Sequence, residues 1–323
     1  MVQGRNLGRN GPLVSALGLG CMRMSNIMGG PQPDPGSDSD GESIATIEAA
    51  LEAGMTLLNT GDFYGMGHNE TLVARAIRGR RHQAFLSVKG GIQRTHAGTI
   101  LGMDGRPNSI KNYAAYSLQR LRVDHIDLYQ PARVDPSVPF EDTVGAVADL
   151  IGEGKVRYLG VSEVNADQLR RANSTHPVAA LEIEYSLASR FIEREMLAVA
   201  RDLGVGVVAY GVVTQGLLAG TMREGVDGKL AASFPSFRRE NLQKNLETVG
   251  LLESLARSKG KTSAQVAIAW VLSRGDDIVP LIGMSRRSRL PENLGALDVV
   301  LDADELTALD RAFAPGAILG SRS

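Results

Sequence analysis

Two residues with complementary chemistry follow neighbouring apolar runs of the sequence. The run TLLNT (56–60) leads to Tyr64, and the run AFLSVKG (84–90) contains Lys89 close to its end. A lysine so near the apolar part of a strand either emerges at the strand end or is buried, where its ammonium group needs partners. Such a cation lowers the pKa of a neighbouring phenol, so the pair predicts a site in which Tyr64 donates a proton. Taken alone, Tyr64 would more often be a packing side chain.

The elements that must position these residues alternate regularly along the chain. Eight short apolar, β-branched runs are predicted to be strands, at 17–21, 56–60, 84–90, 125–131, 156–162, 179–186, 206–211 and 277–283. Helical patterns lie between them, and several end in a helix-stop glycine, as at Gly54, Gly154 and Gly204. Strands that alternate with helices pair in parallel through right-handed crossovers. Eight such units in 323 residues predict an α/β fold, a single-domain (β/α)8 TIM barrel over residues 1–323.

A doubly wound dinucleotide-binding fold is the main alternative. It needs G-x-G-x-x-G directly after its first strand, with an acidic residue about 20 positions further on. Residues 17–25, LGLGCMRMS, contain G-L-G without the third glycine. The barrel is therefore favoured, and its chemistry is expected where the strands end. Two long irregular stretches, 24–42 and 214–240, follow the first and seventh strands. The first should rim that face, and the second is long enough to be a lid or a disordered segment.

The composition excludes several classes of protein. Hydrophobic residues make up 43%, charged residues 22%, and the formal net charge is -1, which is typical of a soluble globular chain. This balance gives no electrostatic case for nucleic acid or an anionic membrane. A single cysteine, and the lack of a signal-like or membrane-spanning apolar run, favour a reducing, cytoplasmic location. The five histidines show no metal-ligand spacing, so no metal is predicted.

The fourth and eighth predicted strands also end in residues suited to binding. The segment YQPAR places Gln130, Ala132 and Arg133 at the end of the fourth strand, where they would line a substrate pocket. The eighth strand ends at Gly283 and runs into a segment with three arginines. Arginines beside a glycine that permits close backbone approach suit a phosphate, such as the extra phosphate of NADP(H).

These features together resemble the aldo-keto reductase family over almost the whole chain. The stretches that carry the resemblance are LGLGCM (17–22), NTGDFYG and NE (59–70), SVKGG (87–91), SLQRLRVDHIDLYQ (117–130), VDPSVPFEDTVGAVADLIGEGKVRYLGVSE (134–163), EYSL (184–187), VAYG (208–211), TSAQVAIAWVLSRGDDIVPLIG (262–283) and the R-x-x-x-N of Arg289 and Asn293. The resemblance implies a barrel that binds NADP(H) across its C-terminal face without a Rossmann domain. It implies cofactor contacts from Gly20, Cys21, Met22, Ser162, Glu163, Glu182, Tyr210, Gly211, Gln215, Gly216, Leu217, Gly283, Arg286, Arg289, Glu292 and Asn293.

The resemblance also shows where this chain departs from the family pattern. The family's catalytic Asp, Tyr, Lys and His correspond to Asn59, Tyr64, Lys89 and Ala132, so two of the four groups are replaced. Glu182 stands where an amide is usual, and Gly211 where serine is usual. Because Asn59 cannot neutralise Lys89, the lysine is expected to lose its ammonium form more easily. Loss of the histidine leaves room for a larger substrate.

The sequence therefore predicts an NADP(H)-dependent oxidoreductase that passes hydride between nicotinamide and a carbonyl or alcohol group of a small-molecule substrate. Tyr64 is the predicted proton donor, assisted by Lys89, with Asn59 in the third catalytic position. The altered residues would also suit a polarised C=C or C=N bond. Other hypotheses are a redox-sensing regulatory subunit that binds NADPH with little turnover, a cofactor-assisted epimerase or sugar-modifying enzyme, and a lyase that uses Lys89 as a Schiff base. Oligomeric state is left open.

Overall fold

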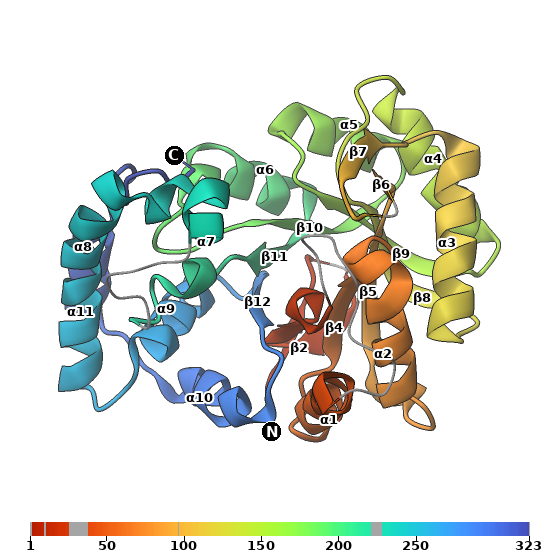
Figure 1. Cartoon of the computed structure of the whole chain (residues 1–323). Helices are drawn as coiled ribbons and strands as arrows, with labels where there is room; N and C mark the ends of the chain where they lie inside the picture. Colours follow the sequence, from red (N-terminus) through yellow and green to blue (C-terminus); the bar gives the residue numbers. More distant parts are fainter. Residues whose placement is uncertain (1, 10, 26–37, 96, 221–227, 323) are drawn as a thin grey trace.

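The computed structural model describes residues 2–9, 11–25, 38–95, 97–220 and 228–322. Eight parallel strands form a closed barrel in the order β10-β11-β12-β3-β4-β5-β8-β9, with helices around it (Figure 1). The barrel strands are β3 (Gly18–Gly20), β4 (Leu57–Gly61), β5 (Phe85–Gly90), β8 (Ile126–Pro131), β9 (Val156–Ser162), β10 (Val178–Glu184), β11 (Gly206–Tyr210) and β12 (Ile278–Gly283). The eight predicted strands and the (β/α)8 fold are confirmed.

Helices surround the barrel, and several of them pack directly against its strands. The helices are α1 (Asp38–Glu52), α2 (His68–Ala76), α3 (Pro107–Leu121), α4 (Phe140–Gly152), α5 (Ala166–Thr175), α6 (Met196–Leu203), α7 (Gly228–Ser233), α8 (Arg239–Ser258), α9 (Ser263–Leu272), α10 (Leu290–Leu294) and α11 (Ala303–Ala312). In α4, the buried Phe140, Val144 and Val147 recur at helical spacing and form the inner face. None of the helices in these described segments is long and apolar enough to cross a bilayer.

Capping residues explain where several helices begin. Asn165 begins α5 by accepting a hydrogen bond from the Gln168 backbone, and the Gln168 side chain accepts one in return. The same reciprocal arrangement begins α9, where Thr262 is the capping residue, and α11, where it is Asp302. Each capping box satisfies two backbone donors that the first helical turn leaves unpaired.

Inside the barrel, side chains from alternate strand positions form layers. The lower layer is apolar and includes Leu57, Leu128, Ala180, Val208, Val279 and Leu281. Two residues further along three of these strands, the next inward positions carry Asn59, Gln130 and Glu182. Because side chains at i and i+2 of a strand share a face, the polar layer lies directly above the apolar one, towards the C-terminal mouth. The strand register therefore gathers the polar residues into one place.

An antiparallel hairpin that the sequence did not predict closes the lower end of the barrel. Its strands are β1 (Gly4–Asn6) and β2 (Leu13–Ser15), and Leu7 and Val14 join the apolar interior layer. The Arg5 guanidinium donates to the Ile278 carbonyl at 2.7 Å, which fixes the hairpin to the start of β12. A second hairpin, β6 (Ile92–Arg94) with β7 (Ile100–Met103), follows β5.

The two predicted long loops differ from expectation in their described parts. Helix α1 begins at Asp38, inside the stretch 24–42, and residues 26–37 of that stretch lie outside the described residues. The stretch 214–240 contains α7 and three-residue 3-10 turns at Thr214–Gly216 and Pro235–Phe237, with 221–227 outside the described residues. The lid stays a prediction.

Candidate active site

A closed hydrogen-bond network lies in the barrel just below its C-terminal mouth. The Lys89 ammonium donates to Asn59 Oδ1 at 2.6 Å and to Glu182 Oε1 at 2.7 Å. Glu182 Oε2 accepts from the side-chain amides of Asn59, at 2.7 Å, and Gln130, at 2.5 Å. Both amides also donate to the Ser87 hydroxyl. All five side chains are buried, so one cation and one carboxylate share a space with almost no water.

Tyr64 lies directly above this network. Lys89 Nζ is 5.3 Å from the centroid of the tyrosine ring. Burial raises the pKa of the Tyr64 phenol, while the charge of Lys89 and its hydrogen bond to the phenol act to lower it; the net pKa stays above the usual value. The phenol is therefore protonated at neutral pH and adjacent to a cation, which is the state a proton donor requires. The structure thus brings Tyr64 and Lys89 together.

The expectation that Lys89 loses its proton more easily is wrong. Burial alone would lower the pKa of its ammonium, but the nearby carboxylate of Glu182 and the interaction with Tyr64 raise it above the usual value. The sequence reasoning considered only Asn59 as the partner of the lysine. Asp62, the nearer acid in sequence, accepts from the Gly91 backbone instead. The negative charge comes from Glu182, on a strand that is not adjacent to β5 in the barrel order.

The three predicted pocket residues differ in their depth below the mouth of the barrel. Gln130 is fully buried within the network, beneath the mouth. Ala132 is also fully buried, and its small side chain contributes no polar atom. Arg133 is exposed; its guanidinium donates to the Ala132 carbonyl at 2.6 Å, and its charge lowers the pKa of Tyr64. Arg133 therefore has the position from which a side chain could reach a substrate above Tyr64.

The ends of β9, β10 and β11 bring five of the predicted cofactor residues together. Glu182 pairs in register with Ser162, which is buried. The Tyr210 hydroxyl donates to Glu163 Oε1 at 3.0 Å, and Gly211 follows with a φ of 72°. Sequence reasoning missed Arg322, which forms an ion pair with Glu163 Oε2 from the far C-terminal segment. No spacing in the sequence links those two residues.

Beside them, β12 and β3 form an open backbone surface. Gly283 pairs with Gly20, and a Cβ built on Gly283 would meet only the Gly20 carbonyl, at 4.0 Å. Gly283 and Arg286 are exposed, whereas Arg289 is paired with Glu292 at 3.1 Å. Asn293 lies behind them, buried, with its amide on the Met284 sulfur.

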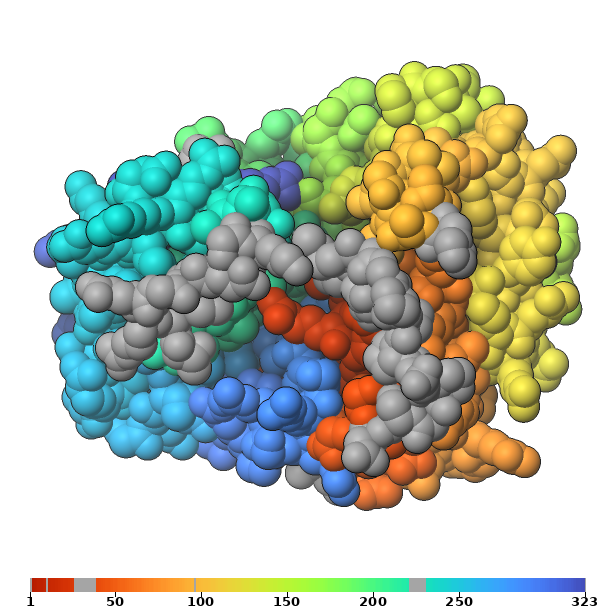
Figure 2. Space-filling view, viewed as in Figure 1, coloured from red at the N-terminus to blue at the C-terminus, as the bar shows by residue number. Residues whose placement is uncertain are grey.

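The remaining predicted cofactor residues lie on either side of the mouth. Met22 is half-buried in the turn after β3, and Cys21 is fully buried, with its thiol pKa raised to about 12 by burial. Arg23, which the sequence analysis did not select, bonds to the side chain of Gln215 and so bridges the mouth. Gly216 has a φ of 99°, and Leu217 is fully buried. Figure 2 shows N-terminal residues, in red, at the centre of one face between blue C-terminal residues and orange residues.

Comparison with known proteins agrees with this arrangement. The pattern that defines the Aldo/keto reductase family matches residues 16–314. The chain belongs to the aldo/keto reductase family. It is 37% identical to a probable aldo-keto reductase 1 of Glycine max over 99% of this chain and 92% of that protein. Membership places the chain among oxidoreductases.

Solved structures of aldo/keto reductases superpose on the chain over nearly its full length. A glycerol dehydrogenase from Gluconobacter oxydans has a TM-score of 0.86 and 29% identity, covering 97% of this chain and 95% of that one. An aldo/keto reductase from Klebsiella pneumoniae, in complex with NADP and acetate, has a TM-score of 0.74 and 26% identity, covering 97% and 96%.

Within this aldo/keto reductase, one further residue of the network could have been found from the sequence. Ser87 was not selected, although it lies two positions before Lys89 on β5 and must face the same way.

A wide depression of about 970 Å³ lies at the opposite end of the barrel, beside the N-terminal hairpin, and is lined by Arg5, Arg9 and Arg201 among others. That depression contains no predicted site residue.

Proposed function

We propose that this aldo/keto reductase transfers hydride between NADP(H) and a small carbonyl or alcohol substrate, with Tyr64 as the proton donor and Lys89 as its assisting cation. The single observation that carries the proposal is the Lys89 ammonium held beneath the phenol of Tyr64. A phenol that stays protonated at neutral pH, next to a fixed positive charge, can protonate the oxygen that forms as a carbonyl accepts hydride.

Lys89 acts in this proposal without touching the substrate. Its pKa is raised by Glu182 and Tyr64, so the ammonium persists through neutral pH. Its positive charge stabilises the Tyr64 phenolate that remains after proton transfer, and its two acceptors hold it in one position. Burial makes this stabilisation stronger than it would be in water.

The residues present fit NADP(H). Gly283, beside Gly20, leaves its backbone open on the C-terminal face, and the exposed Arg286 supplies a cation for a phosphate. Tyr210, anchored through Glu163, presents an aromatic side chain at the end of β11. When bound, the cofactor supplies the hydride. That a relative from Klebsiella pneumoniae was solved with NADP supports the same choice here.

The substrate is proposed to lie above Tyr64, with the exposed Arg133 at the rim. Ala132, directly before Arg133, is fully buried and offers no polar group, so Tyr64 is the group that orients the substrate oxygen. An acceptor with a polarised C=C or C=N bond would meet the same proton donor. A small-molecule substrate of this kind needs no nucleic acid or membrane partner, and we propose a cytoplasmic enzyme.

The test is NADPH oxidation with a panel of aldehydes and ketones, comparing the wild type with Tyr64→Phe. We expect Tyr64→Phe to lose about a hundredfold or more in kcat, because general acid catalysis typically contributes that much. NADPH binding, followed by cofactor fluorescence, should be retained. Wild-type kcat in Tyr64→Phe would remove Tyr64 from the mechanism.

Two other functions are distinguished by the same experiments. A Schiff-base lyase needs a neutral lysine amine, but Lys89 is a raised-pKa ammonium with two acceptors. A regulatory subunit is suggested by Ala132, since this position carries no polar side chain where the family pattern has a catalytic histidine. Tight NADPH binding without turnover on any acceptor would support the regulatory alternative.

A further inference from the structure

The Lys89 ammonium forms its ion pair with a residue distant in both sequence and barrel order. The partner is Glu182 on β10, and both side chains are about 5% exposed. The barrel order places β8 and β9 between β5 and β10. Tyr64 and Cys21 also face the lysine, and Arg133 faces Tyr64; the Cys21 thiol, with a pKa of about 12, stays neutral. Glu182 is thus the anion nearest to this buried cation.

Both carboxylate oxygens of Glu182 accept hydrogen bonds, which fix its position beside Lys89. Oε1 accepts from Lys89, and Oε2 accepts from the amides of Asn59 and Gln130. These contacts are all donors, as an ionised carboxylate requires. Rotation of the carboxylate away from Lys89 would break the bonds on Oε2, so the network fixes Glu182 in the position that neutralises the lysine.

Asn59 completes the arrangement as a neutral bridge. Its carbonyl oxygen accepts from Lys89 at 2.6 Å, and its amide nitrogen donates to Glu182 at 2.7 Å. The amide dipole is thereby aligned between cation and anion. An aspartate at position 59 would instead place a second carboxylate within hydrogen-bond distance of Glu182. One carboxylate at 59 or at 182 suits the lysine, and two would repel each other.

We propose that Glu182 is the positioning residue of this active site: it supplies the counter-charge that keeps Lys89 in place as an ammonium beneath Tyr64, while Asn59 relays between them. The negative charge that balances the Lys89 ammonium is thereby provided from β10 rather than from β4. This inference rests on the proposed function of Tyr64 and Lys89. It adds the residue that sets the protonation state of Lys89.

The test is a charge relocation in the full-length protein. Glu182→Gln removes the counter-charge, so kcat should fall, and the pH above which turnover is lost should shift to lower values, since Lys89 then loses its proton earlier. The double variant Asn59→Asp/Glu182→Gln returns one carboxylate to the lysine from β4. It should regain most of the lost turnover and the wild-type pH profile. Asp310→Asn, which removes a carboxylate paired with Arg274 outside the barrel, is the control and should change neither.

The outcome that overturns the proposal is specific. Wild-type kcat and pH profile in Glu182→Gln, or failure of a folded double variant to recover either of them, would show that Glu182 does not set the charge state of Lys89. Folding of each variant is checked by circular dichroism, so that loss of structure is separated from loss of charge.

A second measurement does not depend on turnover. Unfolding midpoints of the wild type, Lys89→Met, Glu182→Gln and Lys89→Met/Glu182→Gln form a double-mutant cycle. The double variant leaves no uncompensated charge, so it should be less destabilised than the sum of the two single variants. Additive effects would overturn the charge pair. If the cycle shows coupling but the wild type reduces no acceptor, the proposed function fails while the pairing stands.

Discussion

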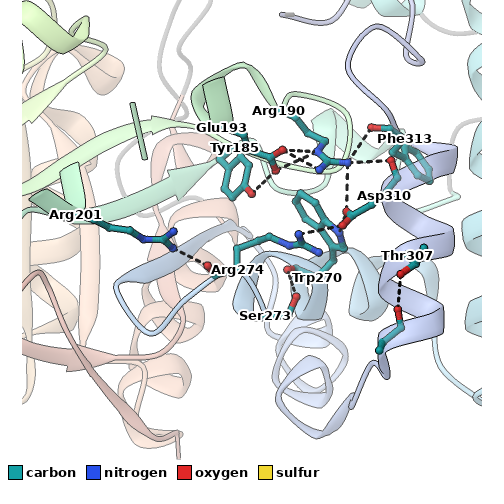
Figure 3. Close-up of polar contacts among 11 residues, drawn as sticks. Tyr185, Arg190, Glu193, Arg201, Trp270, Ser273, Arg274, Thr307, Asp310 and Phe313 are labelled. Carbon is teal, nitrogen blue, oxygen red and sulfur yellow. Dashed lines mark hydrogen bonds and ion pairs between the residues drawn. The ribbon is translucent and has the colours of Figure 1, made fainter. Parts of the chain in front are cut away.

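Two polar clusters, one fully buried and one partly buried, use similar side chains in different parts of the molecule. One surrounds Lys89 inside the barrel; the other surrounds Trp270 between α9, α11 and the turn that precedes α6 (Figure 3). In the second cluster, Asp310 accepts from the Trp270 indole at 3.0 Å and from Arg274 at 3.2 Å. The Arg274 guanidinium also lies 4.4 Å from the Trp270 ring. Both clusters therefore pair cations with carboxylates beside an aromatic ring.

The two clusters differ in the partner of the tyrosine hydroxyl. Arg190 donates to both oxygens of Glu193, and its guanidinium lies 5.2 Å from the ring of Trp270. The Tyr185 hydroxyl donates to Glu193 at 2.7 Å, so the phenol of this cluster is already bound to a carboxylate. At the mouth of the barrel, the phenol of Tyr64 faces a cation instead. A tyrosine bound to a carboxylate stabilises structure, whereas one beside an ammonium can give up its proton.

Among substitutions in the two clusters, the largest loss of stability and turnover is expected for Lys89→Met. Lys89→Met leaves Glu182 buried without its cation, so the free energy of unfolding should fall by about 3–5 kcal/mol. Turnover should be lost together with stability. Chemical denaturation and NADPH oxidation measure the two effects. A fully active Lys89→Met variant would contradict the distinction between the clusters.

The next largest effect is expected at Asp62, a buried acid, and it concerns the pH dependence of stability. Burial raises the pKa of Asp62 to about 7, so the folded state binds a proton that the unfolded chain releases near its usual pKa of 3.8. Stability should therefore decrease as pH rises from about 4 to about 7. Asp62→Asn should remove this loss and increase stability at about pH 8 by up to about 4 kcal/mol, at roughly 1.4 kcal/mol per pKa unit. At low pH the variant should differ little, which denaturation at several pH values would check.

Asp310→Asn should give a smaller effect and should leave catalysis intact. It weakens the acceptor shared by Trp270 and Arg274, so a loss of about 1–3 kcal/mol is expected. Arg311→Gln, exposed on the same helix, should stay within about 0.5 kcal/mol of the wild type. A change in kcat for Asp310→Asn would show that the Trp270 cluster communicates with the site.

The smallest effect is expected for Arg322→Ala. Arg322 is partly exposed and pairs with Glu163, so the loss of stability should be less than about 1 kcal/mol. Because Glu163 anchors the Tyr210 hydroxyl, NADPH binding should weaken more than kcat falls. Cofactor titration by fluorescence tests this, and a change confined to kcat would argue against it.

The sequence allowed the barrel to be predicted because its signals are local. Each strand is a short apolar run bounded by helix-stop signals, and the position of Tyr64 and Lys89 at the ends of adjacent strands followed from that pattern. Glu182 could be placed on a strand but not paired with Lys89, because 93 residues separate them and the pairing depends on how the barrel closes. The hairpin β1–β2 was missed because each of its strands has only three residues. Arg322 belongs to the same class of long-range contact.

The pairing of Lys89 with Glu182 has a consequence for the order in which the protein folds during synthesis. Strands β3 to β9 leave the ribosome before β10, so a partly synthesised chain contains the lysine without its carboxylate. An incomplete barrel that buried Lys89 at that stage would leave its ammonium without Glu182 as an acceptor, which is costly. Stable closure of the polar layer therefore has to wait for the C-terminal half of the chain, and the interior of the barrel is completed late.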